Sequence, residues 1–200
     1  MKKILPIFLS MLLCATFANA QPYSSEPSGS GDQTLSKEAI VSRRAEIFAD
    51  SLVKAFEAAD WNVYMNISFP GAIKYYGGKK GYLEHVMRGR KVETDKIEQQ
   101  PSTIKVLQVL TDDMDQWQAV VERKTERFLD DQPTILITYL IGQSLDDGTN
   151  WTFFDIGMNT VENVIYMMPE VFPRLSIPEN RIVKKYRSFL HATIIEKAVP

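Results

Sequence analysis

Four consecutive segments decide the fold: TIKVLQVLT (Thr103–Thr111), WQAVVERKTERF (Trp117–Phe128), TILITYLIGQS (Thr134–Ser144) and NWTFFDIG (Asn150–Gly157). They are rich in Val, Ile, Thr and aromatic residues, which favour half-buried strands. Short acidic turns separate them. The last turn contains Asp147-Gly148, a pair typical of tight hairpins because glycine tolerates positive φ. The pattern predicts an antiparallel meander of three or four strands.

A long amphipathic helix is predicted before the meander. Ser36 is a suitable N-cap, and Glu38 in the first turn suits the helix dipole. Apolar residues then recur at steps of three and four, which predicts a helix of about six or seven turns. These residues are Val41, Ala45, Phe48, Leu52, Ala55 and Ala59. The predicted fold class is therefore α+β, with this helix packed on a curved antiparallel sheet.

Shorter elements are expected between the long helix and the meander. Asp60 is expected to cap a short helix that begins at Trp61. Ala72–Tyr76 suggests a short strand, Gly77-Gly78 a turn, and Lys79–Met87 a third helix. No phosphate-binding spacing surrounds the two glycines, so they are interpreted as a turn.

The first residues have the pattern of a secretory signal peptide, residues 1–20. Two lysines precede a short apolar run, and Ala18-Asn19-Ala20 provides a small-x-small cleavage site. A lipoprotein anchor on Cys14 and a retained membrane anchor are the weaker alternatives. Residues 21–34 are rich in Ser, Pro and Gly, which predicts a flexible linker. The protein is therefore expected to be exported, either periplasmic or secreted, without stable membrane insertion after cleavage.

Composition excludes several classes of function. Cleavage would remove Cys14, the single cysteine, so the mature chain could form neither a disulfide nor a thiolate metal site. It would also lower the basic count from 23 to 21 against 25 acids, so that the formal charge would change from −2 to −4. A mildly acidic chain lacks the charge of a nucleic-acid binder. Two histidines far apart in sequence also predict no metal site and no cofactor.

The predicted third strand of the meander suggests a homodimer. Both of its faces are apolar, whereas a sheet with one solvated face would alternate. One face carries Ile135, Ile137, Tyr139 and Ile141, and the other carries Leu136 and Leu140. Something must cover the second face, and the sheet of a second copy would do so.

The C-terminal residues suggest a closure and a tail. Thr160–Pro173 is expected to pack as a short irregular closure. Residues 179–200 form a tail whose apolar residues lie near helical spacing and whose basic residues cluster at Lys184, Lys185 and Arg187. This spacing predicts an amphipathic helix that caps its own domain or a dimer mate, and the alternatives are a helix that binds a partner or a membrane surface.

The order of these elements resembles the nuclear-transport-factor-two-like superfamily across residues 35–178. The local features are EAADWNVY (Glu57–Tyr64) at the end of the long helix, GGKKGYLEHV (Gly77–Val86) and WTFFDIG (Trp151–Gly157) in the closing strand. The resemblance implies a cone-shaped, cystatin-like fold that encloses a pocket between sheet and helices. The superfamily includes ketosteroid isomerases, polyketide cyclases, dehydratases, transport factors and exported domains.

The catalytic set of a steroid isomerase does not carry over. The position of its donor tyrosine is Val53, and the segment Ile73–Tyr76, where its base is expected, contains no acid. The leading interpretation is therefore a domain that binds a small apolar ligand without catalysis. The alternatives are a hydro-lyase or isomerase of polyketide-cyclase type and a protein-interaction module.

Candidate site residues follow from this interpretation, although a structural role is the commoner explanation for each of them. If catalysis occurs, His85 and Asp155 are the expected acid–base pair. The candidate ligand-binding residues are Tyr64, Tyr75, Tyr139, Trp151 and Phe153.

Overall fold

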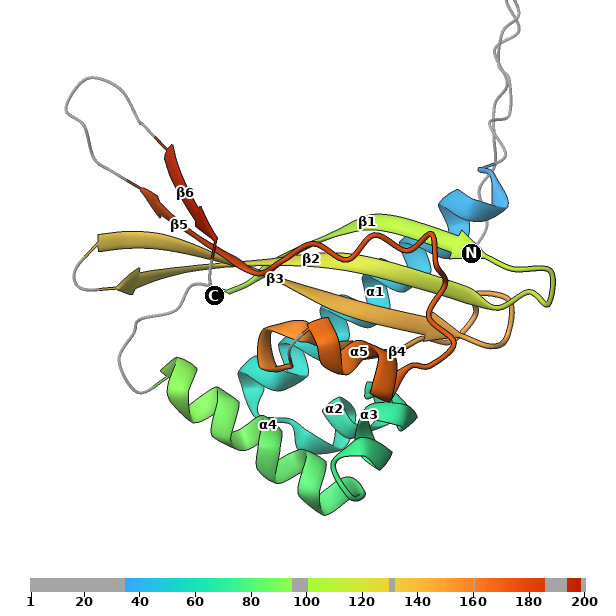
Figure 1. Ribbon diagram of the computed structural model, residues 1–200, viewed down its shortest axis with the longest axis horizontal. Coiled ribbons are helices and arrows are strands. Elements are labelled where there is room, and N and C mark those ends of the chain that lie inside the picture. The colour runs from blue at the N-terminus through green and yellow to red at the C-terminus, as the bar shows by residue number, and fades with distance from the viewer. Residues whose placement is uncertain (1–34, 95–100, 130–131, 160, 186–193, 199–200) are drawn as a thin grey trace, which may run out of the picture. The chain divides into compact units, whose positions relative to one another are not determined.

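A computed structural model describes residues 35–94, 101–129, 132–159, 161–185 and 194–198 (Figure 1). The expected signal peptide and linker, and with them Cys14, lie outside the described residues. So does much of the expected tail, including Arg187. The described residues belong to one compact unit.

The long helix α1 (Lys37–Ala58) is confirmed together with its cap. Ser36 Oγ accepts a hydrogen bond from the amide of Ala39 at 3.2 Å, and Ala59 ends the helix in the left-handed region at φ 57°. Asp60 then caps α2 (Trp61–Ile67), because its Oδ1 accepts from the amide of Val63 at 3.1 Å. Both caps were readable from local sequence, since a capping side chain satisfies a free amide only a few residues away.

The predicted meander is confirmed as the centre of an antiparallel sheet. The strands, in chain order, are β1 (Thr103–Thr111), β2 (Trp117–Leu129), β3 (Gln132–Ser144), β4 (Thr152–Asp155), β5 (Arg181–Lys185) and β6 (Ile194–Ala198). Their spatial order is β1-β2-β3-β5-β6, and β4 also pairs with β3. Strands β4 and β5 use the same edge of β3 at different places, residues 140–143 and 134–137. Asp147 and Gly148 have φ of 59° and 73°, as the tight turn before β4 requires.

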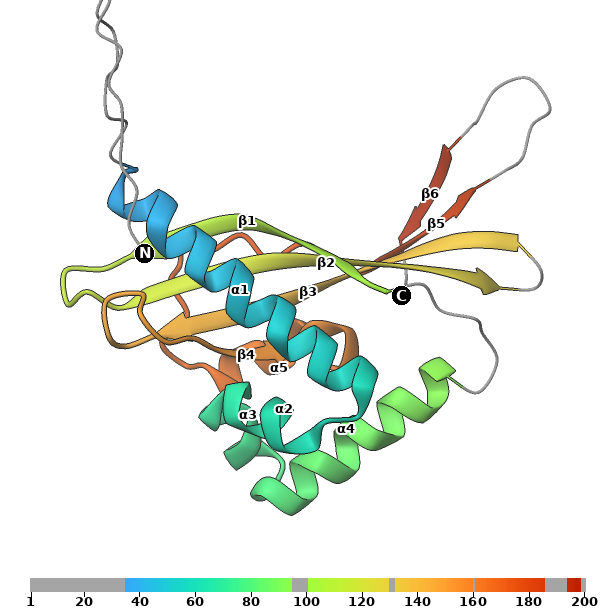
Figure 2. The ribbon, with the colours of Figure 1, turned by 180° about the vertical axis from the view of Figure 1, so that it is seen from behind.

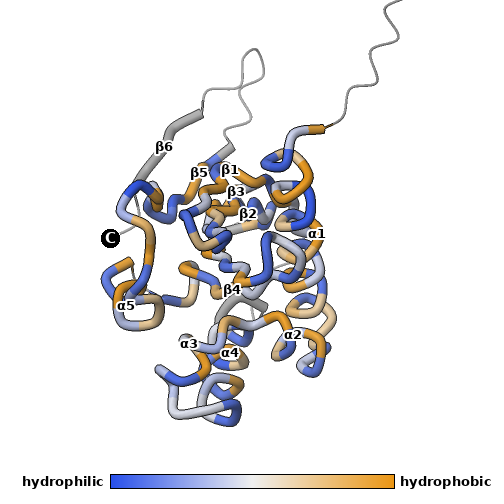
Figure 3. The backbone as a smooth tube through the Cα atoms, turned by 90° about the vertical axis from the view of Figure 1, so that its right-hand side faces the viewer, coloured by the Kyte–Doolittle hydropathy of each residue, from blue (hydrophilic) through white to orange (hydrophobic). Residues whose placement is uncertain are grey.

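Helices cover one face of this sheet. Figure 2 shows α1 crossing the strands, with α2, α3 (Pro70–Tyr75) and α4 (Lys79–Thr94) following beyond its end. Alternate residues of β2, among them Trp117, Ala119 and Val121, face α1 and are buried in the core. Figure 3 shows apolar segments both in the strands and along α1. We call this the helix side of the sheet.

The chain itself covers part of the opposite face. After η1 (Ile156–Met158) and α5 (Val161–Met167), residues 168–180 run back across the strands to β5, and we call them the strap (Figure 1). Gln118 of β2 donates to Glu170 O and accepts from the Phe172 amide, both at 2.8 Å. Gln108 of β1 makes the equivalent two bonds with Arg174 and Ser176. These bonds hold the strap against what we call the strap side of the sheet.

The predicted strand at Ala72–Tyr76 is wrong, because these residues belong to α3 and its end. Pro70 occupies the first turn of α3, where its fixed φ suits a helix and its missing amide hydrogen costs nothing. Gly77 and Gly78 then close the helix at φ of 78° and 102°. The helix after them continues beyond the expected end at Met87 to Thr94.

The predicted helix after residue 178 is wrong where the structure describes it. Arg181–Lys185 is β5, and Ile182 and Val183 pair with Leu136 and Ile135 of β3. Strand β6 pairs with β5 in turn. The apolar residues fitted a helical spacing, but β4 is short and leaves an open edge of β3, whose backbone groups gain partners when β5 joins it. The closure expected to be irregular also contains a helix, α5.

Candidate functional site

A buried ion pair lies on the helix side of the sheet, where sequence analysis placed a pocket. Arg123 Nη1 on β2 lies 3.2 Å from Asp155 Oδ2 at the end of β4, and their side chains are 3% and 6% exposed. Asp155 Oδ1 also accepts from the amide of Gly157 at 2.6 Å. Buried charges are costly unless they are paired and hydrogen-bonded, and both conditions are met for this carboxylate.

Arg123 also ties the sheet to the C-terminal end of α1. Its Nε donates to Ser102 Oγ at 3.1 Å, and its guanidinium carbon lies 5.2 Å from the ring centroid of Phe56. The amide of Ser102 in turn donates to Glu57 Oε1 at 3.0 Å. One side chain therefore links β2, β4, the start of β1 and α1, which is a structural role.

Burial raises the pKa of Asp155 above its ordinary value. The charge of Arg123 and the Gly157 amide act in the opposite direction, since both stabilise the carboxylate. A protonated carboxyl is thus easier to form at this position than at the surface.

Two buried tyrosines lie near the ion pair. The rings of Tyr64 and Tyr82 stack with centroids 6.3 Å apart. Burial raises the pKa of both phenols, and the negative charge of Asp155 contributes in the same direction. Both phenols therefore stay protonated and able to donate. Sequence analysis singled out Tyr64 and missed Tyr82, which looked like one more apolar position of a helix.

His85 lies in a separate contact group on α4. Its ring stacks on Tyr76 at 4.1 Å between centroids, and its Nε2 lies 3.1 Å from the carbonyl oxygen of Met158. Burial lowers the pKa of His85 from its ordinary 6.5. The hydroxyl of Tyr76 donates to Asn159 Oδ1, and Asn159 Nδ2 donates to the backbone oxygen of Asp155 at 2.6 Å.

His85 and Asp155 are thus linked only through the turn at residues 155–159. Neither a hydrogen bond nor an ion pair joins their side chains in the part of the chain that the structure describes. The acid–base pairing of the two residues stays a prediction.

Three of the remaining candidate residues pack against the protein itself. Trp151 and Phe153 are fully buried, with ring centroids 5.8 Å apart. The indole of Trp151 donates to Gly148 O at 3.2 Å. Tyr75 is 44% exposed, and its hydroxyl donates to Asn163 on α5.

Tyr139 is also fully buried, at 1% exposed, but it lies on the strap side, among the residues that line a groove of about 630 Å³. We call this the strap-side groove. Its residues come from β1, β2 and β3 and from the join between the strap and β5. They are Leu107, Glu122, Tyr139, Pro178, Glu179, Asn180 and Arg181. Glu122 and Tyr139 are direct cross-strand partners, so their side chains leave the sheet on the same face and next to each other.

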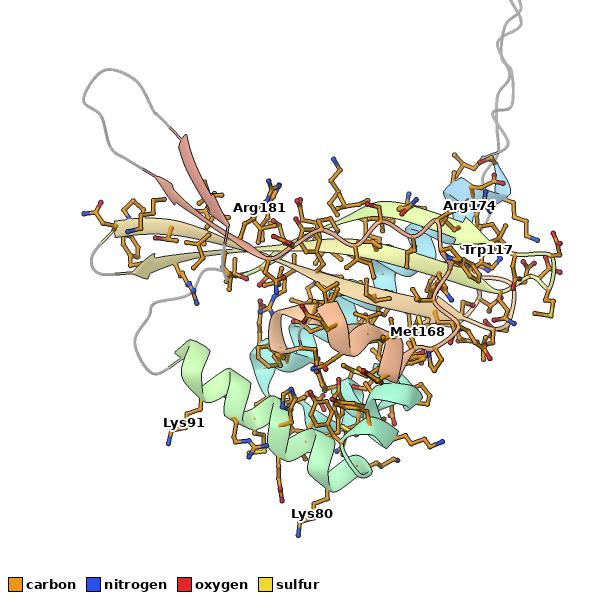
Figure 4. The ribbon with its side chains drawn as sticks, viewed as in Figure 1. Lys80, Lys91, Trp117, Met168, Arg174 and Arg181 are labelled. Carbon is orange, nitrogen blue, oxygen red and sulfur yellow. The ribbon has the colours of Figure 1, made fainter. Side chains whose placement is uncertain are left out.

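Charges of both signs meet in the strap-side groove. Glu122 has a nearly buried side chain, with Lys124 Nζ 2.8 Å from its Oε1 and Arg181 Nη2 3.9 Å from its Oε2. Figure 4 shows Arg181 where β5 meets the central strands. Arg181 pairs with Ile137, two residues from Tyr139, which places both side chains on one face.

Asn180 adds an unsatisfied acceptor to this groove. Its Nδ2 donates to the backbone oxygen of Ile156 at 3.2 Å. Its Oδ1 is buried and has no hydrogen-bond partner among the described residues. Sequence analysis missed Asn180 and Arg181 because it treated the tail as a separate helix. One signal for this groove was nevertheless present in the sequence. Glu122 is a charged residue between apolar positions of a strand.

A second groove, of about 780 Å³, lies between the first half of α1 and β1. Its wall includes exposed residues such as Leu35 and Ile47, together with charges of both signs. Nothing predicted from the sequence falls in it.

No group of three or more His, Cys, Asp and Glu residues that could hold a metal ion occurs among the described residues. No described helix is both long enough and apolar enough to cross a membrane. No family model, curated protein or solved structure matches the chain.

Proposed function

We propose that this protein binds a small molecule in the strap-side groove and does not catalyse a reaction on it. The observation that carries the proposal is the nearly buried carboxylate of Glu122 beside Tyr139 and Arg181 in a groove of about 630 Å³. Ligand sites combine concave shape with a few convergent polar groups, and this groove has both.

The helix side supports binding less well. Arg123, Asp155 and Ser102 are engaged with one another, and Trp151 and Phe153 pack as core residues. A ligand there would have to replace contacts that hold the sheet to α1. The expected ligand therefore changes from a purely apolar molecule to one that also carries polar groups, because Glu122, Glu179 and Arg181 are among the residues that line the strap-side groove.

The proposal includes export and the nuclear-transport-factor-two-like arrangement. The signal-peptide pattern of residues 1–20 supports export. The order of a long helix, short helices and then an antiparallel meander supports the superfamily. Fold likeness transfers function poorly, so the argument for binding rests on the groove.

A fragment screen followed by amide chemical shifts in ¹⁵N-labelled mature protein tests this function. We expect a bound fragment to shift the amides of Glu122, Tyr139 and Arg181, and we expect Arg181→Gln to weaken binding by about tenfold or more. Arg174→Gln is the matched control, since this exposed strap residue does not line the groove. A screen in which every hit shifts amides on the helix side would refute the proposed site.

A further inference from the structure

We propose that the ligand of the strap-side groove is a small zwitterion, a free α-amino acid with an apolar side chain. This inference rests on the proposed function and names the chemical class that the groove would select.

The balance of charge in the groove favours a ligand with both signs. Glu122 and Glu179 contribute two carboxylates, Arg181 contributes a guanidinium, and Lys124 contacts Glu122 from beside the groove. A purely anionic ligand would meet two carboxylates, and a purely cationic one would meet Arg181 and Lys124. Like charges brought together at a binding site oppose association. A zwitterion presents each group to a charge of the opposite sign.

The spacing of the charged groups suits adjacent ligand charges. Arg181 Nη2 and Glu122 Oε2 are 3.9 Å apart, which is beyond the usual hydrogen-bond distance of about 3 Å. The two opposite charges therefore lie side by side as an ion pair. An α-amino acid carries its ammonium and carboxylate on one carbon, so both of its charges can lie against this pair.

The hydrogen-bonding groups also match. An ammonium group offers three donors, and the carboxylates of Glu122 and Glu179 are acceptors among the groove residues. A ligand carboxylate accepts well from a guanidinium, whose planar fork suits two parallel bonds.

The remaining wall is apolar. Leu107 is 42% exposed at the register shift of β1, and Pro178 lies among the other lining residues. An aliphatic side chain can remove part of this surface from water, which stabilises binding.

Three related ligands test the inference: L-norvaline, butylamine, which is L-norvaline without its carboxylate, and pentanoate, which is L-norvaline without its ammonium. Binding is measured by amide shifts of Glu122, Tyr139 and Arg181. We expect L-norvaline to bind at least about tenfold more tightly than either analogue, a difference of about 1.4 kcal/mol. Glycine should bind more weakly than L-norvaline because it lacks the aliphatic chain.

Two variants test which residue binds which charged group of the ligand. Arg181→Gln should remove the advantage of L-norvaline over butylamine, and Glu122→Gln should reduce its advantage over pentanoate. Arg174→Gln, outside the groove, should leave all affinities unchanged, and circular dichroism checks that each variant is folded.

The outcomes separate the two proposals. If butylamine or pentanoate binds the groove as tightly as L-norvaline, the zwitterion inference is wrong and the proposed function stands. If L-norvaline does not bind but other fragments shift the groove amides, the zwitterion inference is again wrong and the proposed function stands. If nothing shifts those amides, both proposals fail.

Discussion

Arg123 and Asp155 are the clearest case of a contact between residues far apart in sequence that determines stability. We expect Arg123→Leu to lower the free energy of unfolding by about 3–5 kcal/mol, because it leaves Asp155 buried without its counter-charge. Urea unfolding of the purified variant measures this.

The double variant Arg123→Leu with Asp155→Leu separates loss of the pair from loss of packing. Its cost should be clearly smaller than the sum of the two single costs, since no unpaired charge remains. Arg174→Leu, an exposed change, should stay within about 0.5 kcal/mol of the original protein. A cost below about 1 kcal/mol for Arg123→Leu would contradict the buried role of the pair.

His85 gives a pH dependence with a definite sign. Burial holds its pKa in the folded protein below the ordinary 6.5, so the unfolded chain binds the proton more readily. The contribution of His85 to stability is therefore complete above about pH 6.5 and is lost as the pH falls through the folded pKa. We expect His85→Gln to remove this part of the pH dependence.

The same expectation can be read directly by NMR. Titration of the imidazole resonances gives the pKa, and His191→Gln assigns the two signals, since the chain has two histidines. A folded pKa for His85 above 6.5 would reverse the sign and refute the prediction.

The strap is the element on which the strap side of the sheet depends, and Gln118 fixes it. Gln118→Leu removes a donor from Glu170 O and an acceptor from the Phe172 amide. We expect the free energy of unfolding to fall by about 1–3 kcal/mol, because water replaces these bonds only in part. Amide exchange at Phe172 should become faster.

Gln108→Leu is the matched control for this prediction. Gln108 makes the same pair of bonds with Arg174 and Ser176, but those contacts are exposed to solvent. Its loss should therefore cost less than that of Gln118. If both variants lower the free energy of unfolding equally, burial does not decide how strongly these contacts hold the strap.

At the scale of the whole molecule, the strap changes the argument for a dimer. The two apolar faces of β3 suggested a second copy, yet the chain supplies a cover of its own. Ile137 and Ile141 are buried on the strap side within one chain. The dimer stays a prediction, and native mass spectrometry of the mature protein at low micromolar concentration tests it. A monomer across the concentration range would contradict it, and a co-purified small molecule would identify the ligand class at once.

The elements whose signals are local were predictable from the sequence. The strand pattern of β1–β3, the helical spacing of α1, the capping residues Ser36 and Asp60 and the Asp147-Gly148 turn each act within a few residues. Pro70 was also a local signal, but its preference for a first helical turn was not used, and α3 was predicted as a strand.

The sequence by itself determined an α+β chain with a long helix before an antiparallel meander, because periodicity and capping depend on neighbouring residues. Only the tertiary structure decided that Arg181–Lys185 is a strand, because the free edge of β3 offers partners that no local pattern records. The same holds for the pairing of Arg123 with Asp155 and for the strap-side groove. The residues of the strap-side groove come from four separate segments, and only folding brings Leu107, Glu122, Tyr139 and Arg181 together.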